Sequence, residues 1–352
     1  MKKTPIVFPR AHMPRDVIIE WWYYNGHLRD ALGRRYAFMD CLFKVNALKA
    51  NIPFSNRVLF PEKHPHLYFA HSVLTDITNK RNEKDVQPYS LVSRDSFTRP
   101  ELFVNYLNPL SFGFTNHEIA QTGPASFHIK TDTIDLALDA RKPPLLEQGS
   151  GYVEAGDRIF GYYSFTDLSA KGLIRANGKW IAVEGKAWMD HQWADMGFNK
   201  DRWNWFSLQL DNGSDVMCAE YIADSAHAYI FDIIDRNGKA MHGHDVRLTP
   251  SKKKWRSTKS GISYALSWTI EIPSRKAILQ VKAPVTNQEM LFFNIDYWEG
   301  PLDVSGIMDG KPVKGVGFME LVHAGKTLDY LALAEQELQK KAIKKLKGWW
   351  RS

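Results

Sequence analysis

The stretch EWWYYNGHL, residues 20–28, places four aromatic rings behind a glutamate and follows them with asparagine, glycine and histidine. Aromatic residues favour β-strands, and the side chains of a strand point alternately to its two faces. The odd positions Trp21, Tyr23, Asn25 and His27 therefore share one face that combines rings with polar tips. A small-molecule cavity needs such a surface, but a solvated sheet face or a core with paired polar groups would give the same pattern.

The stretch WNWFSLQLDNG, residues 203–213, repeats this arrangement. When Trp203 is aligned on Trp21, Trp205 falls on Tyr23, and a turn glycine follows both stretches. In the second copy the even positions Phe206, Leu208 and Leu210 are expected in a core, whereas the odd positions mix rings with polar groups. The repeat predicts two β-domains of similar build.

Strand-like runs joined by Gly, Asn and Asp turns fill most of the chain before residue 327, and helical periodicity is rare there. Many short strands of this kind indicate sandwiches or barrels. A chain of 352 residues is too long for one compact core. We therefore predict an all-β fold of two domains, with the boundary near residues 190–202.

The last segment, residues 327–352, differs from the rest of the chain. Leu331, Leu338, Ala342 and Leu346 follow helical spacing, with lysines on the opposite face. The spacing predicts a basic amphipathic helix. Such a helix either packs on the body of the protein with its lysines in water or lies on an anionic membrane surface.

Composition excludes several classes of protein. A hydrophobic content of 44% rules out a disordered chain, and the net charge of +7 forms no basic stripe with interleaved aromatics, so nucleic-acid binding is not expected. No apolar run is long enough for a transmembrane helix, and the start of the chain lacks the apolar core of a leader peptide. We expect a cytoplasmic protein, membrane-associated if the last segment binds lipid, or exported if a leader has been removed. Cys41 and Cys218 are expected to be free and buried.

The stretch GKAWMDHQWAD, residues 185–195, holds the densest group of chemically active side chains. Asp190 and His191 lie there between two tryptophans, Trp188 and Trp193. A carboxyl group beside aromatic rings loses hydration, which raises its pKa and makes it a usable general acid near neutral pH. Paired polar groups at a corner between two domains would give the same sequence.

Histidines give a weaker signal. His71 lies on an apolar strand face, where it would either relay a proton or be an ordinary hydrogen-bonded core residue. His64 with His66, and His242 with His244, form His-x-His pairs, but neither pair has a third ligand at a metal-site spacing, so no metal site is predicted. The chain has no P-loop, G-x-G-x-x-G, G-x-S-x-G or C-x-x-C motif, so phosphate-cofactor, triad-hydrolase and redox functions find no support.

Eight segments occur in this order along the chain: EWWYYNGHL, FAHSVLTDI, PPLLEQGSGYV, YYSFTDL, GKAWMDHQWAD, WNWFSLQLDNG, NQEM…YWEG and GVGFMEL. Together they resemble the CrtC/AttH lipocalin-like family, which includes carotenoid 1,2-hydratase (hydroxyneurosporene synthase). The resemblance implies two lipocalin-like β-barrel or sandwich domains, residues 1–195 and 196–326, followed by the helix at 327–352. It also implies a ligand cavity within or between the two domains.

The chemistry implied by this resemblance is the addition of water across a terminal isoprenoid double bond without a cofactor. Fungal relatives resemble pericyclases that fold a polyene in a similar cavity. Protonation of an alkene gives a tertiary carbocation, which aromatic rings stabilise through their quadrupoles. Asp190 is the expected acid, with Glu20 as the alternative, and His71 and Asn25 would position water or the acid's proton. The expected substrate-binding residues are Trp21, Tyr23, His27, Tyr163, Trp188, His191, Trp193, Trp203 and Trp205.

We therefore expect a cofactor-independent, hydratase-like enzyme for a long apolar isoprenoid or polyene ligand. A cyclase or pericyclase-type isomerase and a non-enzymatic carrier of lipid or isoprenoid are the alternatives. Carboxyl groups that point into the cavity would favour an enzyme, whereas carboxyl groups that cap backbone groups at its rim would favour a carrier. The chain departs from the hydratase pattern at Gln192, where that branch often has a glutamate.

Overall fold

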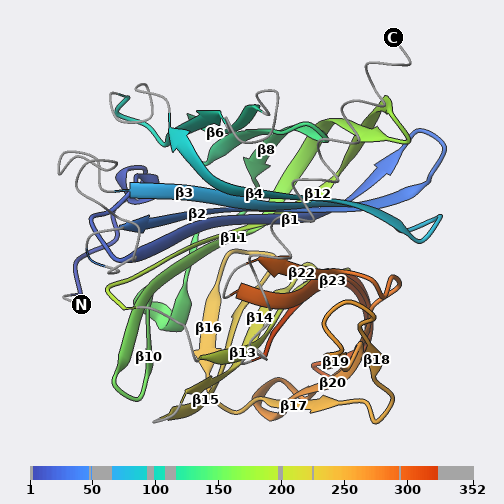
Figure 1. The fold of residues 1–352 in the computed structure, drawn as a ribbon. Coiled ribbons are helices and arrows are strands. Elements are labelled where there is room, and N and C mark those ends of the chain that lie inside the picture. The colour runs from blue at the N-terminus through green and yellow to red at the C-terminus, as the bar shows by residue number, and fades with distance from the viewer. Residues whose placement is uncertain are drawn as a thin grey trace.

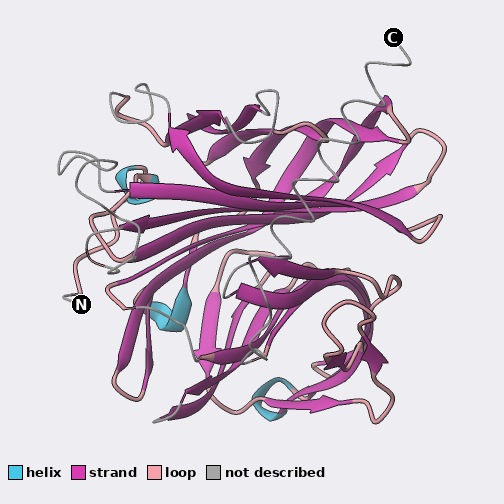
Figure 2. Ribbon diagram, in the orientation of Figure 1, coloured by secondary structure: helices cyan, strands magenta, loops and turns pink. Residues whose placement is uncertain are grey.

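The computed structural model describes residues 3–46, 66–92, 99–107, 116–196, 201–223, 226–292 and 295–323, together with Lys49. Within these residues the chain forms two curled β-sheets that lie against one another, joined by turns and short 3-10 helices (Figure 1 and Figure 2). The all-β prediction is confirmed. The predicted helix at residues 327–352, and the membrane contact expected from it, lie outside the described residues.

The first sheet closes on itself. Its strands are hydrogen-bonded in the order β10-β11-β12-β1-β2-β3-β4-β5-β6-β7-β8, and β8 pairs with β11, so that the strands from β11 to β8 form a barrel. The short strand β9 also pairs with β11. The bounds are β1 Ile19–Asp30, β2 Arg35–Asn46, β3 His66–Asp76, β4 Arg81–Val92, β5 Phe103–Leu107, β6 Asn116–Gly123, β7 Ser126–Lys130, β8 Ile134–Ala140, β9 Leu145–Leu146, β10 Tyr152–Ala155, β11 Arg158–Ala176 and β12 Lys179–Ala194.

The second sheet is open and has the order β16-β15-β14-β13-β24-β23-β21-β20-β17, with β22 paired to β23. Strands β18 and β19 form a separate hairpin. The bounds are β13 Arg202–Leu210, β14 Asp215–Ala223, β15 Ala226–Ile234, β16 Ala240–Gly243, β17 Arg247–Pro250, β18 Trp255–Arg256, β19 Ser263–Tyr264, β20 Ser267–Ile272, β21 Ala277–Lys282, β22 Glu289–Phe292, β23 Ile295–Met308 and β24 Lys311–Val322. The 3-10 helices are η1 Arg10–His12, η4 Glu147–Gly149 and η5 Pro273–Arg275.

The turn between β1 and β2 shows how local sequence sets the register of the first strands. Gly33 adopts a φ of +73°, which favours glycine because it has no Cβ. The Asp30 carboxylate accepts hydrogen bonds from the backbone N–H groups of Leu32 and Arg34. This turn fixes the pairing of β1 with β2 and thereby decides which side chains of β1 face the second sheet.

The side chains of β1 alternate between two cores. Trp22, Tyr24 and Leu28 are buried inside the barrel, whereas Tyr23 is buried between the two sheets. The even and odd positions of EWWYYNGHL therefore serve different environments, as the period of a strand requires.

Strand β13 repeats this division in the second sheet. Phe206, Leu208 and Leu210 pack inside the curl of that sheet, as the sequence predicts, while Trp205 faces the first sheet. The side chains that project from both sheets into the space between them form a third apolar cluster, which includes Met39, and which we call the inter-sheet core. The candidate site lies in this inter-sheet core.

Both cysteines are buried and free, as predicted. Cys41 belongs to the inter-sheet core and Cys218 to the core of the second sheet. In the part of the chain that the structure describes, no helix has the length and apolar character that crossing a membrane requires.

Candidate active site

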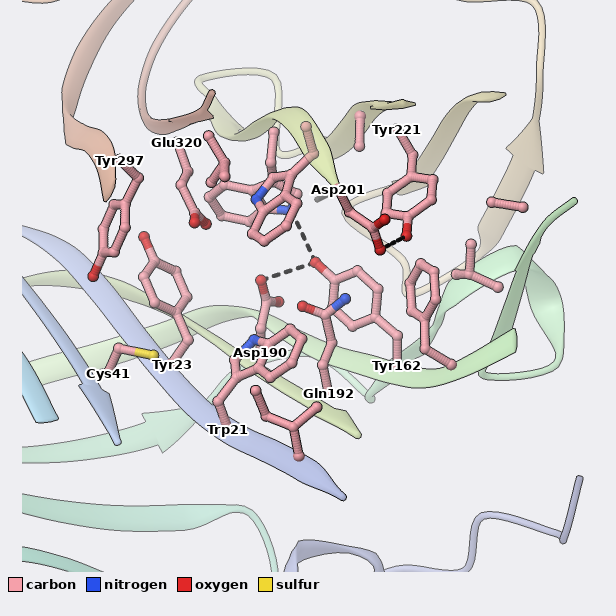
Figure 3. Close-up of a pocket in the computed structure, with 18 of the residues that line it drawn as sticks. Trp21, Tyr23, Cys41, Tyr162, Asp190, Gln192, Asp201, Tyr221, Tyr297 and Glu320 are labelled. Carbon is pink, nitrogen blue, oxygen red and sulfur yellow. Dashed lines mark hydrogen bonds between the residues drawn. The ribbon is translucent and has the colours of Figure 1, made fainter. Parts of the chain in front are cut away.

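A cavity of about 150 Å³ lies between the two sheets. Aromatic rings from both sheets form much of its wall, and four carboxyl groups line it, three of which, Asp190, Asp201 and Glu320, are labelled in Figure 3. The rings are Trp21, Tyr23, Phe43, Phe160, Tyr162, Trp203, Trp205, Tyr221 and Tyr297, and the fourth carboxyl group is that of Glu299. The ligand cavity that the family resemblance placed within or between two domains thus lies between the two sheets.

Asp190 is held on the first sheet by three hydrogen-bond donors. Trp188 Nε1 and Ser164 Oγ both donate to Asp190 Oδ1, each at 2.6 Å. The Tyr162 hydroxyl donates to Asp190 Oδ2 at 2.8 Å. Burial raises the pKa of Asp190 to about 7, although the three hydrogen bonds act in the opposite direction. This carboxyl group therefore changes its protonation state near neutral pH.

Trp205 fixes the direction of the hydrogen bond between Tyr162 and Asp190. Trp205 Nε1, from the second sheet, donates to the Tyr162 hydroxyl oxygen at 2.9 Å. Because an indole N–H can only donate, the Tyr162 oxygen accepts this bond and its own proton points to Asp190. Figure 3 shows both bonds as dashed lines that link the two walls of the cavity. The arrangement stabilises the anionic form of Asp190.

Two glutamates face the cavity from the second sheet. Glu299 of β23 and Glu320 of β24 are register partners on adjacent strands. Burial raises the pKa of Glu320 to about 8, and burial together with the charge of Glu320 raises the pKa of Glu299 well above its ordinary value. Two buried carboxyl groups so close together cannot both ionise readily, so the pair holds a proton at neutral pH.

Two polar groups from opposite sheets meet at this site. The Tyr23 hydroxyl interacts with the Glu299 carboxyl group, although neither the hydroxyl nor Glu299 Oε1 makes a hydrogen bond of good geometry among the described residues. Both residues line the cavity. Buried polar atoms are nearly always well paired, so a ligand or water could replace this imperfect interaction.

Another part of the cavity wall carries Asp201, a carboxyl group that is paired with an arginine. Asp201 accepts a hydrogen bond from the Tyr221 hydroxyl (Figure 3). On its other side, Arg158 Nη2 lies 3.2 Å from Asp201 Oδ1. Asp201 therefore differs from the other three acids, since it has a cationic partner. Gln192, where the hydratase branch often has glutamate, also lines the cavity.

Five of the predicted site residues line the cavity: Asp190, Trp21, Tyr23, Trp203 and Trp205. Three others lie behind its wall.

Trp188 donates a hydrogen bond to Asp190 from behind the cavity wall. Asn25 is the register partner of Trp188 and is buried beside it. Its Nδ2 group has no hydrogen-bond partner among the described residues. His71 Nδ1 lies 2.5 Å from the hydroxyl of Tyr297, which does face the cavity. Contact of His71 or Asn25 with a ligand would therefore have to be indirect.

Glu20, the alternative acid, points away from the cavity. It lies inside the barrel, where Lys44 Nζ is 2.6 Å from Glu20 Oε2 and His191 Nε2 is 2.8 Å from Oε1. Lys44 and His191 lower the pKa of Glu20 against the opposing effect of burial. The carboxyl group is thus an anion in a buried ion pair, an arrangement that does not favour the expected role of Glu20 as an acid.

Three predicted binding residues share the barrel interior with Glu20. The Tyr163 hydroxyl lies 3.0 Å from His191 Nδ1 and 2.6 Å from His12 Nδ1. The Trp193 ring stacks under the guanidinium of Arg15 at 3.9 Å. Alternation along β11 and β12 sends these side chains inward while their neighbours Tyr162 and Asp190 face the cavity. They do not line this cavity, and their expected contact with substrate stays a prediction.

His27 has a different role from the predicted one. Its Nε2 atom lies 2.9 Å from the carbonyl oxygen of Gly317 in β24, and its ring packs edge-on against Phe318. It therefore joins the two sheets and does not line the cavity.

Sequence reasoning missed Tyr162, Glu299 and Glu320 as site residues. Tyr162 adjoins Tyr163 in YYSFTDL, and only the pairing of β11 shows which ring faces the cavity. Glu320 alternates with Phe318 and Val322 in β24, so a charged residue on an otherwise apolar strand face was an available signal.

Within the described residues, no group of three or more His, Cys, Asp or Glu side chains is arranged to hold a metal ion. His242 and His244 lie in or beside β16, and His64 falls outside the described residues.

Comparison with known proteins places the chain among β-proteins of the same build. The AttH-like family matches residues 1–325. The crystal structure of an AttH protein from Nitrosomonas europaea has a TM-score of 0.68 and 21% identity, and the match covers 92% of this chain and 98% of that one. Kievitone hydratase from Nectria haematococca has a TM-score of 0.71 and 16% identity, with 92% and 96% covered. At these identities the likeness shows a shared fold.

One curated relative also matches in sequence. The dehydratase asqC of Emericella nidulans is 24% identical over 204 residues, which amount to 54% of this chain and 58% of the relative. The chain thus spans little more than half the length of that relative.

Proposed function

This chain belongs to the AttH-like family, and from that premise we propose that it is a hydratase-type lyase. In this proposal the enzyme adds water to a carbon–carbon double bond of a neutral, largely apolar small molecule, or removes water in the reverse direction. The observation that carries the proposal is the ring-walled cavity that is lined by Asp190 from the first sheet and by Glu299 and Glu320 from the second. The name of the relative that matches in sequence, a dehydratase, supports the same reaction class.

The Glu299/Glu320 pair is the proton donor in the hydration direction, because it holds a proton at neutral pH. The O–H bond of one glutamic acid breaks as its proton forms a C–H bond with one alkene carbon, using the π electrons of the double bond. The cation left on the other carbon lies among the rings of Trp21, Trp203 and Trp205, whose faces stabilise positive charge.

Asp190 is the base in this scheme. Water forms a C–O bond with the cationic carbon, and its surplus proton moves to the Asp190 carboxylate. Three donors favour the anionic form of Asp190, whereas Glu299 and Glu320 destabilise each other's anions, and this contrast supports the division of labour. The sequence-based role of Asp190 as the acid is therefore exchanged for that of the base.

The wall of the cavity also indicates the class of ligand. Its described lining residues include no lysine or arginine, so a phosphorylated or carboxylated ligand would meet carboxyl groups without a cation to offset them. The Tyr23 hydroxyl and Glu299 Oε1, which interact with each other without a hydrogen bond of good geometry, favour a ligand that carries a hydroxyl or carbonyl oxygen. We therefore propose a neutral ligand with at least one such oxygen.

The size of the cavity limits how much of a ligand it encloses. Its volume of about 150 Å³ is below the roughly 300–1,000 Å³ of pockets for drug-sized ligands. A small molecule, or the unsaturated end of a longer isoprenoid, fits this proposal better than a whole carotenoid. The Asp190 carboxyl group bonds to three side chains around the cavity rather than capping backbone groups at its rim, which favours an enzyme over a carrier.

Isotope incorporation tests the proposed reaction. The purified protein is incubated in H₂¹⁸O with prenylated phenols, isoprenoid alcohols and an acyclic carotenoid, and the products are analysed by mass spectrometry. We expect an alcohol that carries ¹⁸O, and we expect its formation to fall about 10²–10⁴-fold in Asp190→Asn and Glu320→Gln. Glu184→Gln, an exposed change on the same strand as Asp190, is the matched control.

Two results would contradict the proposal. Tight binding of a member of the panel without any ¹⁸O product would indicate a carrier. Undiminished product formation in Asp190→Asn and Glu320→Gln would show that these carboxyl groups do not perform the chemistry.

A further inference from the structure

Buried polar groups continue from Asp190 away from the cavity. Ser164, which is fully buried and is the register partner of Asp190 in the β11–β12 pair, bridges two carboxyl groups. Its Oγ atom lies 2.6 Å from Asp190 Oδ1 and 2.6 Å from Glu147 Oε1. One hydroxyl proton serves two acceptors, so a proton that reaches either carboxyl group can be passed to the other.

Glu147 leads from the first sheet to the second. It begins the 3-10 helix η4, and this helix contacts β15 through Gln148. The backbone N–H and Nε2 of Gln148 donate to the two carboxyl oxygens of Asp232, at 2.9 and 2.8 Å. Burial and the adjacent carboxyl group raise the pKa of Glu147 well above its ordinary value, and burial raises that of Asp232 to about 6. The reaction scheme above uses neither of these buried acids.

The path ends at an exposed histidine. His242 of β16 is the register partner of Asp232 in β15, and its side chain is exposed to solvent. Its ring lies over Gly149 of η4, where a Cβ would stand only 2.6 Å from the ring Cε1 atom. Gly149 also adopts a φ of +72°, so the glycine allows both the turn of η4 and the close approach of the imidazole.

We propose that Ser164, Glu147, Asp232 and His242 form a proton relay that connects Asp190 with solvent when a ligand fills the cavity. The Glu147/Asp232 pair, which holds a proton because of its raised pKa, first passes one proton to the His242 imidazole, which releases it to water. Asp190 then gives its proton to the Ser164 oxygen while the Ser164 hydroxyl proton moves to the Glu147 carboxylate and refills the pair. Rotation of the Ser164 hydroxyl then restores the starting arrangement, and no atom other than the proton has moved.

The need for a proton relay follows from the proposed hydration reaction and depends on it. Each hydration leaves a proton on Asp190 and removes one from the Glu299/Glu320 pair, and a bound ligand displaces the water that would otherwise carry the proton away. The glutamate pair regains its proton from solvent through the cavity once the product has left. The titratable groups near Asp190 are Tyr162, Glu299, Glu320 and Glu147. Those near Glu147 are Asp190 and Asp232, and those near Asp232 are Glu147 and His242.

Fluorine NMR tests the relay without any substrate. Trp188 Nε1 donates to Asp190, so 5-fluorotryptophan at position 188, assigned with Trp188→Phe, reports the protonation of Asp190. Relaxation dispersion at pH 7 gives the exchange rate between the two protonation states, measured with the cavity filled by the neutral apolar probe N-phenyl-1-naphthylamine. We expect Ser164→Ala and His242→Gln to slow this exchange by about 10²-fold, the order that a positioned proton donor or acceptor contributes.

Control variants separate the relay from simple structural support. Ser164→Thr, which keeps a hydroxyl, should restore the exchange rate, and Ser169→Ala, on the same strand with its Oγ bonded to the Asp139 carbonyl, should not change it. Unchanged exchange in His242→Gln, an exposed position where folding is not at risk, overturns the relay. So does a Trp188 signal that does not titrate between pH 5 and 9. Because no substrate is used, these results stand apart from the outcome of the ¹⁸O experiment.

Discussion

Asp190 and Glu320 occupy equivalent positions in the two sheets. Asp190 is the register partner of Tyr23 in the β1–β12 pair, and Glu320 is the register partner of Trp205 in the β13–β24 pair. Trp205 aligns on Tyr23 in the sequence repeat, so the two carboxyl groups are related by the same repeat and approach one cavity from its two sides.

The strand on the other side of each carboxyl group makes the two positions chemically different. Asp190 has Ser164 as its second register partner, whereas Glu320 has Glu299. A hydroxyl donor stabilises the anion of Asp190, and a second carboxyl group destabilises the anion of Glu320. Two equivalent backbone positions thus hold a base and an acid.

The free energy of unfolding should fall as the pH rises from 7.5 to 8.5. In this window the unfolded chain has ionised all three of Glu320, Glu299 and Glu147. The folded protein still holds protons on Glu299 and Glu147, whose pKa values are raised well above the ordinary value, and loses that of Glu320 only within the window, because its pKa is about 8. The unfolded state therefore binds fewer protons, and each group that stays protonated contributes a loss of about 1.4 kcal/mol per pH unit.

Urea unfolding at the two pH values measures this slope. Glu320→Gln should flatten it and raise stability at pH 8.5, because the buried group no longer has to stay protonated. Glu271→Gln, a change in the partly exposed pair with Arg247, should leave the slope as it is. A stability that rises between pH 7.5 and 8.5 would mean that the acids of the cavity are ionised in the folded protein.

Tyr162→Phe should raise the pKa of Asp190 above 7. The change removes the hydroxyl that donates to Asp190 Oδ2, and a hydrogen bond to a charged group stabilises it by about 1.5–3 kcal/mol, which corresponds to one pKa unit or more. The ¹³Cγ resonance of Asp190 followed against pH gives the pKa. Tyr152→Phe, whose hydroxyl donates to the Thr4 carbonyl, should have no effect, and an equal shift in both variants would refute the specific role of Tyr162.

Glu20→Gln should destabilise the protein by about 3–5 kcal/mol, because it leaves the fully buried Lys44 ammonium without its counter-charge. The double change Glu20→Gln with Lys44→Met should recover much of this loss. Chemical denaturation of the three proteins measures the effect. A small loss in Glu20→Gln, accompanied by loss of catalysis, would return Glu20 to the list of candidate acids.

Gly161→Ala should destabilise the barrel, because a Cβ at this position would overlap the indole ring of Trp193. Overpacking of this kind costs about 1–3 kcal/mol. In the double variant with Trp193→Phe the smaller ring makes room for the methyl group, so the two losses should not add. Strict additivity of the two unfolding free energies would show that the ring moves away without cost.

The period of the strands made much of this architecture predictable. Ring-and-polar alternation in residues 20–28 and 203–210 indicated strands with two different faces, and Tyr23 and Trp205 do line the cavity together. The presence of chemically active groups near Asp190 was also visible, since its stretch combines a carboxyl group with several rings.

What could not be predicted depends on pairing between strands far apart in the sequence. Nothing in EWWYYNGHL shows that Glu20 meets Lys44 of β2 and His191 of β12, because both contacts arise only when the barrel closes. Nor does the sequence show which of Tyr162 and Tyr163 faces the cavity, because a shift of one residue in the strand register would exchange the faces to which the two rings point. The Glu299/Glu320 pair likewise exists only through the register of β23 and β24.

The alternation of β1 also has a consequence for how this protein can change. Tyr23 contributes to the cavity and Trp22 to the interior of the barrel, although the two are adjacent in the chain. Mutations at Trp21 and Tyr23 can therefore alter the lining of the cavity while the residues that fill the barrel stay untouched. A family built in this way can diversify its chemistry by point mutation on one side of a strand, and a library randomised at those positions alone should retain a high proportion of folded members.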